Sequence, residues 1–121
     1  MEPIFVIRLP LAKPLFDRWQ AQPDLLLRLM SKEQMEALDG FIVDRLADRD
    51  GGPGISARNI DKLRFDDALR NGSFRLHFQI DRRYCCSDVM SCSDDYIDFT
   101  FDYDGDVIVA QGSYFQWELD N

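Results

Sequence analysis

The last third of this 121-residue chain has no basic side chain. Residues 84–121 contain no Lys, Arg or His, although the whole chain has 14 Lys and Arg and one His. Against these stand 22 Asp and Glu, so that the formal net charge is −8. A protein that binds the phosphate backbone directly needs a cationic surface, and this balance therefore excludes nucleic acid as a direct partner.

Long apolar runs are also missing. No stretch approaches the roughly 20 apolar residues that a membrane-spanning helix requires. The N-terminus does not read as a signal peptide, because Glu2 stands where a positive charge is expected and Arg8 interrupts the apolar run. We therefore expect a cytoplasmic protein that has no membrane partner.

The three cysteines do not form a recognisable framework. Cys85, Cys86 and Cys92 are an odd number within one short segment, which favours free thiols over disulfides. Their C-C-x5-C spacing lacks the paired ligands of a zinc site. In the segment 102–106, Gly105 comes one position too early for a calcium-binding loop. We predict no metal and no cofactor.

Catalytic signatures are absent as well. The chain has no phosphate-binding glycine loop and no nucleophile motif. His77, the only histidine, falls on the polar side of a predicted strand, where no partner for acid–base work can be assigned. We predict that the protein is not an enzyme.

The length and composition predict one domain over residues 1–121. Residues 1–50 are mainly helical, with a short edge strand over residues 4–9. Pro14 suits the first turn of a helix that carries Phe16 and Trp19 on one face. Ser31 and Gln34 have the spacing of a capping box at the start of the clearest helix.

Residues 51–72 are a glycine-rich break followed by a predicted helix over residues 59–70, with Asn71-Gly72 as its stop signal. From Ser73 on, apolar and polar residues alternate, which is typical of strands with one buried face. The apolar set is Phe74, Leu76, Phe78, Ile80, Ile97, Phe99, Phe101, Tyr103, Phe115, Trp117 and Leu119.

The turns complete this prediction. Asp104-Gly105 is predicted to form a two-residue hairpin turn, Gly112 is a candidate bulge, and residues 84–95 are a twelve-residue loop. We predict an α+β fold, in which N-terminal helices pack on one face of a C-terminal antiparallel β-meander of three to four strands over residues 73–121.

The negative charge is concentrated at one end of the chain. Residues 1–56 have seven basic and nine acidic side chains, and residues 57–83 have seven basic and four acidic ones. Residues 84–121 have nine acidic side chains and no basic one. The last third therefore carries the whole excess of negative charge.

Two interpretations of these acids remain open. They can be a solvated face that is partly neutralised by Arg75 and His77 on a neighbouring strand, pairing with Asp98 or Asp102. Alternatively they are a docking surface for a basic partner, in which tyrosines are the aromatic anchors. The residues predicted to bind that partner are Asp94, Asp95, Tyr96, Asp98, Asp102, Tyr103, Asp104, Asp106 and Tyr114.

A small, acidic chain with aromatic-flanked carboxylates and no catalytic motif resembles bacterial immunity proteins, those of contact-dependent growth inhibition and polymorphic-toxin systems. The resemblance is one of class. It implies a binding protein that neutralises a cognate basic toxin, in the first instance a nuclease domain, by electrostatic and shape complementarity, with carboxylates standing in for phosphates. The alternative is a small-ligand-binding or enzymatic domain with a pocket between helices and sheet, marked by Trp19, His77 and Trp117. An adaptor module in a larger assembly fits the sequence as well as an inhibitor does.

Overall fold

Five strands and three helices make up the computed structural model, which describes residues 3–46, 52–83 and 90–114. In chain order they are β1 (Phe5–Pro10), α1 (Lys13–Ala21), α2 (Leu25–Leu29), α3 (Lys32–Asp44), β2 (Gly54–Asp66), β3 (Asn71–Arg83), β4 (Met90–Tyr103) and β5 (Val107–Gly112). This confirms the α+β class. The sheet has more strands than the expected three to four.

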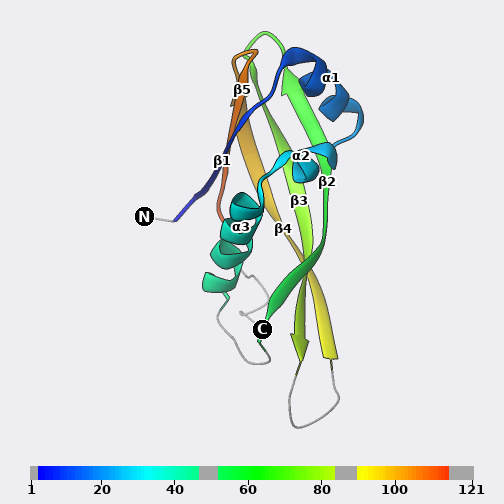
Figure 1. Cartoon of the computed structure of the whole chain (residues 1–121), viewed down its shortest axis with the longest axis vertical. Coiled ribbons are helices and arrows are strands. Elements are labelled where there is room, and N and C mark those ends of the chain that lie inside the picture. Colours follow the sequence, from blue (N-terminus) through cyan, green and yellow to red (C-terminus); the bar gives the residue numbers. More distant parts are fainter. Residues whose placement is uncertain (1–2, 47–51, 84–89, 115–121) are drawn as a thin grey trace.

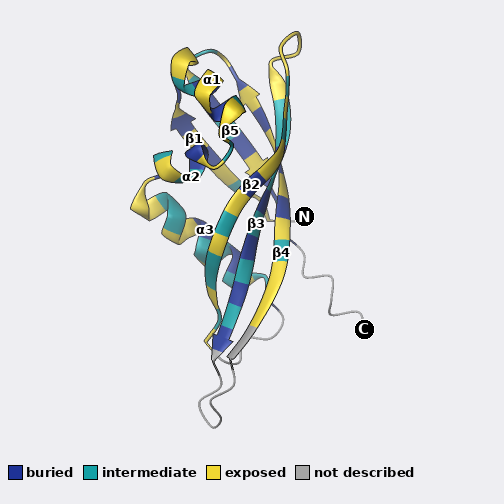
Figure 2. Cartoon of the chain, turned by 90° about the vertical axis from the view of Figure 1, so that its right-hand side faces the viewer, coloured by how far each residue is buried: buried dark blue, intermediate teal, exposed yellow. Residues whose placement is uncertain are grey.

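All five strands belong to one antiparallel sheet with the order β1-β5-β4-β3-β2. The N-terminal strand β1 pairs with β5, so that the two ends of the described chain lie side by side at one edge of the sheet (Figure 1). The three helices connect β1 to β2, which are the two opposite edge strands. They lie on one side of the sheet (Figure 2).

The core lies between this helical layer and the inner face of the sheet. Alternate residues of β3 and β4 are buried as predicted: Phe74, Leu76, Phe78, Ile80, Ile97, Phe99, Phe101 and Tyr103. Trp19 of α1 contacts the Phe74 and Phe101 rings edge-on, with centroids 5.6 and 5.2 Å apart. Such aromatic contacts contribute about 0.5–1.5 kcal/mol each beyond the burial of their area.

The N-terminus of α3 connects the helical layer to the edge strand β1. The Ser31 hydroxyl accepts the Gln34 backbone N–H, and the Gln34 side chain accepts the Ser31 backbone N–H, which confirms the predicted capping box. The Gln34 side-chain amide also donates to the Arg8 carbonyl oxygen at 3.1 Å. One side chain thus caps a helix and engages a backbone group of β1.

The predicted helix over residues 59–70 is wrong, because this segment lies mostly in the edge strand β2 and continues into a turn at residues 67–70. The pairing of β2 with β3 shifts by one residue between Ser56 and Asn59 and again between Asp61 and Arg64. Each shift is a β-bulge that inserts an extra residue and breaks the alternation of strand residues. Ile60 and the half-buried Leu63 are consequently three positions apart, a spacing that imitates a helix.

The turns differ in detail from the prediction. The connection between β3 and β4 is shorter than the expected loop over residues 84–95, because β4 already begins at Met90. Three residues, 104–106, separate β4 from β5 where a two-residue turn was expected. Gly112 pairs with Phe5 and with Phe99 without a shift in register, so the bulges lie in β2. The expected alternation of Phe115, Trp117 and Leu119 falls outside the described residues.

Candidate partner-binding face

The face of the sheet opposite the helices, here called the outer face, carries the polar half of the two alternating strands β3 and β4. On β4 this half includes, after the exposed Cys92, a row of five exposed side chains: Asp94, Tyr96, Asp98, Thr100 and Asp102. At about 3.4 Å per residue, the row extends over about 27 Å. Exposed residues recur along β4 in Figure 2. Four of the nine predicted binding residues therefore share one row.

Asp98, in the middle of this row, is neutralised within the sheet. It lies opposite Arg75 on β3, whose Nε and Nη2 donate to the two carboxylate oxygens at 2.8 and 3.2 Å. The guanidinium group also lies over the Tyr96 ring, 3.9 Å from its centroid. The hydrogen bond to Asp98 raises the pKa of Arg75, so the guanidinium stays charged. The predicted pairing of Arg75 with Asp98 is confirmed.

His77 pairs with a residue of β2, where a partner on β4 was expected. Its Nε2 lies 2.8 Å from Asp61 Oδ1 on the edge strand β2, and neither Asp98 nor Asp102 is its partner. The ring is still a neighbour of Tyr96, with centroids 6.3 Å apart. His77 thus extends the polar network of the outer face toward β2.

Asp94 and Asp102, near the two ends of the row, are exposed and form no ion pair within the described residues. Gln79 and Asn71 are their register partners on β3, and neither is charged. These two carboxylates are the acids on the outer face of β4 whose charge the described sheet leaves uncompensated.

Asp95 does not belong to this face. It follows the parity of the buried residues of β4 and lies opposite Phe78. Its Oδ2 accepts the Tyr114 hydroxyl at 2.6 Å, and its Oδ1 accepts the Tyr96 backbone N–H at 2.9 Å. Tyr114 is itself buried and contacts the Phe78 ring at 5.4 Å. Asp95 and Tyr114 thus bond to each other and do not offer a contact surface to a partner.

Tyr103 is also removed from the predicted surface, because it is buried in the core. Its ring is stacked on Phe16 of α1 with centroids 3.8 Å apart. The hydroxyl lies 2.7 Å from the Leu11 carbonyl oxygen and 2.9 Å from the Gly105 carbonyl oxygen, and donates to one of them at a time. Burial raises the pKa of the hydroxyl. The alternation of β4 had already placed Tyr103 on the apolar side.

Asp104 and Asp106 lie at the turn between β4 and β5. Oδ1 of Asp104 accepts the backbone N–H groups of Val107 and Asp106, each at 2.8 Å. Both bonds lower the pKa of Asp104, and the bond from Val107 has the larger effect. Asp104 therefore fixes the turn, whereas the Asp106 side chain is exposed beside it.

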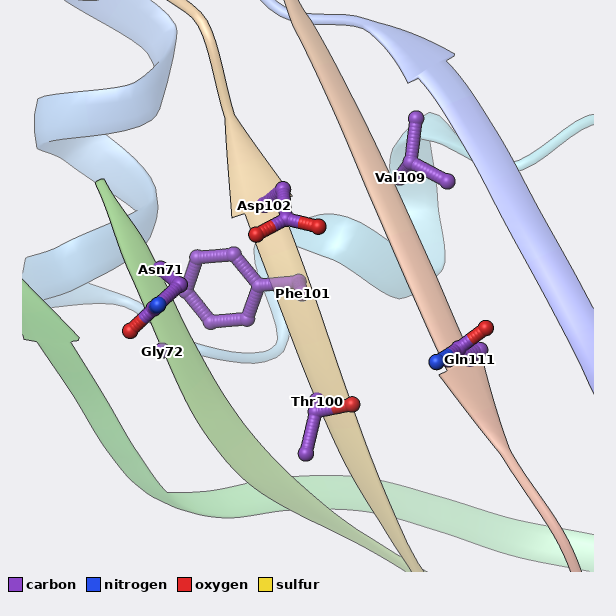
Figure 3. Close-up of a pocket in the computed structure, with 7 residues that line it drawn as sticks. All are labelled: Asn71, Gly72, Thr100, Phe101, Asp102, Val109 and Gln111. Atoms are coloured by element: carbon purple, nitrogen blue, oxygen red, sulfur yellow. The ribbon is translucent and has the colours of Figure 1, made fainter. Parts of the chain in front are cut away.

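A hollow of about 370 Å³ opens on the outer face next to Asp102 (Figure 3). Its lining is Asn71 and Gly72 from β3, Thr100, Phe101 and Asp102 from β4, and Val109 and Gln111 from β5. Sequence reasoning missed the polar members of this set other than Asp102. The sequence predicts the end of a helix at Asn71, and the neighbourhood of Gln111 and Thr100 follows only from the strand register.

The residues considered for other chemistry lie far from a common site. Trp19 is buried in the core and donates from Nε1 to the Pro23 carbonyl oxygen at 2.9 Å, whereas His77 is on the outer face. Cys92 is exposed, and its hydrogen bond to Asp81 raises the pKa of the thiol, which disfavours the reactive thiolate. Cys85, Cys86 and Trp117 lie outside the described residues.

Two further observations concern the described residues alone. No group of three or more His, Cys, Asp or Glu side chains is placed to hold a metal ion. None of the three helices is long and apolar enough to cross a membrane.

Comparison with known proteins gives no relative: no family model, no curated protein and no solved structure matches this chain.

Proposed function

We propose that this chain is an immunity-type binding protein that neutralises a cognate basic toxin, in the first instance a nuclease domain, by covering it with the outer face of the sheet. The observation that carries the proposal is the row of exposed side chains on β4, in which Asp94 and Asp102 flank the Arg75–Asp98–Tyr96 cluster. Carboxylates in such a row are complementary in charge to the basic side chains with which a nuclease holds phosphates.

The outer face is the part of the sheet that offers a broad contact surface. All three helices occupy the other side, as Figure 2 shows. Both edges of the sheet are engaged by the helical layer, since Gln34 donates to the Arg8 carbonyl on β1 and Asp24 accepts the Ile60 N–H on β2 at 2.7 Å. Such contacts protect edge strands from pairing with another chain. A partner is therefore expected to bind across the strands.

The charge distribution favours a basic partner over a neutral one. Like charges held on one sheet face repel each other and oppose folding, so their concentration has a cost that an oppositely charged partner would offset. Complementary charge also accelerates association, by an effect that weakens as salt screens it. Tyr96, 40% exposed and fixed under Arg75, adds a rigid aromatic group in the middle of the face.

The proposal is tested by affinity capture with the full chain from its native host, followed by purification of the retained protein. The expected result is a basic domain that degrades DNA or RNA and loses this activity when one equivalent of the chain is added. An acidic partner, or a retained enzyme whose activity the chain does not change, would overturn the proposal.

A further inference from the structure

The hollow on the outer face has an unusual combination of neighbours around one carboxylate. In the register of the sheet, Asp102 lies between Asn71 on β3 and Val109 on β5, and Thr100 lies beside Gln111. Cross-strand neighbours of this kind have Cβ atoms roughly 4.5–5.5 Å apart. The carboxylate therefore has an amide on one side and an aliphatic side chain on the other (Figure 3).

No cation of the described chain occupies this carboxylate. Asp102 is in none of the ion pairs formed by the described residues. In the register, Arg8 is separated from it by Val109, which at about 4.8 Å per strand makes roughly 10 Å. Arg70 directs its Nε to the Tyr103 carbonyl oxygen at 3.2 Å. The charge of Asp102 is thus available to a ligand.

One carboxylate of the same strand already binds a guanidinium. Asp98, four residues earlier on the same face, holds the Arg75 guanidinium through both oxygens, with the Tyr96 ring as its support. On β3, Arg75 lies opposite Asp98, whereas Asn71 lies opposite Asp102. Asn71 cannot supply a charge. An arginine from outside the chain would complete at Asp102 the arrangement that Arg75 completes at Asp98.

We infer that the hollow beside Asp102 receives an arginine side chain of the basic partner, an inference that rests on the proposed function. A guanidinium has five N–H donors and no acceptor, and it binds a carboxylate through two parallel bonds. The hollow offers that carboxylate together with the amide oxygens of Asn71 and Gln111 and the Thr100 hydroxyl. Val109 gives the aliphatic stem an apolar wall. The volume of about 370 Å³ is at the lower end of the roughly 300–1,000 Å³ of small-ligand sites.

The inference can be tested without the partner. The probe is N-acetyl-arginine methylamide, added to the isotope-labelled full chain while backbone amide NMR shifts are recorded. We expect saturable shifts centred on Asn71, Thr100, Asp102 and Gln111. N-acetyl-citrulline methylamide, which has the same shape and no charge, is expected to give none.

Substitution of the carboxylate provides the matched control. Asp102→Asn keeps the shape of the side chain and removes its charge, and is expected to weaken binding of the arginine probe by roughly tenfold or more. Glu36→Gln on the exposed side of α3 removes the same charge from the other layer and is expected to leave the affinity unchanged.

The outcomes separate this inference from the proposed function. Shifts that are diffuse, that are equal for the citrulline derivative, or that persist in Asp102→Asn would overturn the arginine site, whatever partner is captured. Saturable, Asp102-dependent arginine binding together with the capture of a partner that is not a basic toxin would sustain the site and remove the function proposed for it.

Discussion

At the scale of single residues, two questions decide whether a predicted acid or tyrosine can meet a partner: which way it points and what it already contacts. Asp98 points outward but holds Arg75, whereas Tyr103 and Tyr114 point inward. Asp94 and Asp102 point outward without an ion pair among the described residues. The predicted set thus contains structural residues beside surface ones.

The Tyr103 hydroxyl gives the first prediction. Tyr103→Phe keeps the ring on Phe16 and removes the donor to the Leu11 or Gly105 carbonyl. Leaving a buried carbonyl without its donor costs about 1–3 kcal/mol of unfolding free energy. Urea denaturation measures this loss. Tyr96→Phe, on an exposed tyrosine, is the matched control and is expected to change stability by less than about 0.5 kcal/mol.

Gly72 and Gly40 give the second prediction. Alanine is expected to lower the free energy of unfolding at Gly72 and to raise it at Gly40. A Cβ at Gly72 on β3 would lie 2.0 Å from the Arg64 carbonyl oxygen on β2 and 2.6 Å from the Phe101 ring on β4. Gly72→Ala therefore forces β3 away from these neighbouring strands. We expect a loss of about 1–3 kcal/mol, the range of overpacked sites.

Gly40→Ala, in α3, is the comparison. Apart from the backbone of α3 itself and the two neighbouring residues, no atom of the described chain lies within 4 Å of the added Cβ. The helix gains about 0.5–1 kcal/mol because alanine has the better helix propensity. Thermal unfolding of the two variants measures both effects. A Gly72→Ala protein as stable as the unsubstituted chain would contradict the described contact between β2, β3 and β4.

At the scale of elements, periodicity predicted the strands that keep a strict alternation and failed where the alternation is interrupted. β3 and β4 repeat every second residue, and their buried faces were predicted residue by residue. β2 contains two bulges with Ala57 and Lys62 at φ values of 52° and 55°, and no glycine marks either position. Because the extra residues shift the phase, local sequence imitates a helix there.

Local sequence could not predict the register in which the strands pair, for a different reason. The outer row of β4 follows from alternation alone, but the hollow requires Asn71, Thr100 and Gln111 to be neighbours on three strands. That neighbourhood depends on the register of β3, β4 and β5, which long-range packing sets. The sequence therefore indicated the acids of the candidate site without its polar surroundings.

The turn between β4 and β5 gives a pH-dependent prediction. The pKa of Asp104 is lowered in the folded chain, so its contribution to stability is present above its ordinary value of 3.8 and is lost as the pH falls through the folded pKa. Asp104→Asn removes this titration. We expect the stability difference between the unsubstituted chain and Asp104→Asn to be constant at neutral pH and to shrink below pH 3.8. Denaturation midpoints over an acid pH series measure it, and a difference independent of pH would contradict the role of the carboxylate in the turn.

At the scale of the whole molecule, the sheet separates two tasks. Its inner face and the helices form the core, and its outer face displays a row of polar and acidic side chains. The last third of the chain, with nine acidic and no basic residues, supplies the β4 row, while β3 supplies Arg75 and His77 as partial compensation. The first interpretation of the acids thus applies to Asp98, which is compensated by Arg75 within the sheet. Asp94 and Asp102 are the carboxylates that the proposed function assigns to a partner.

The measurement that tests this account most directly is the affinity of the captured basic partner for charge-reversed variants over a salt series. Asp94→Lys combined with Asp102→Lys reverses two outer-face charges and leaves the Arg75–Asp98 pair in place. Glu33→Lys combined with Glu36→Lys makes the same change in net charge on exposed positions of α3. We predict that the first pair of substitutions weakens binding at least tenfold, or about 1.4 kcal/mol, and flattens the dependence on salt, and that the second changes neither substantially. Equal effects of the two pairs, or an unchanged salt dependence in the first, would contradict the claim that the outer face of β4 binds the partner.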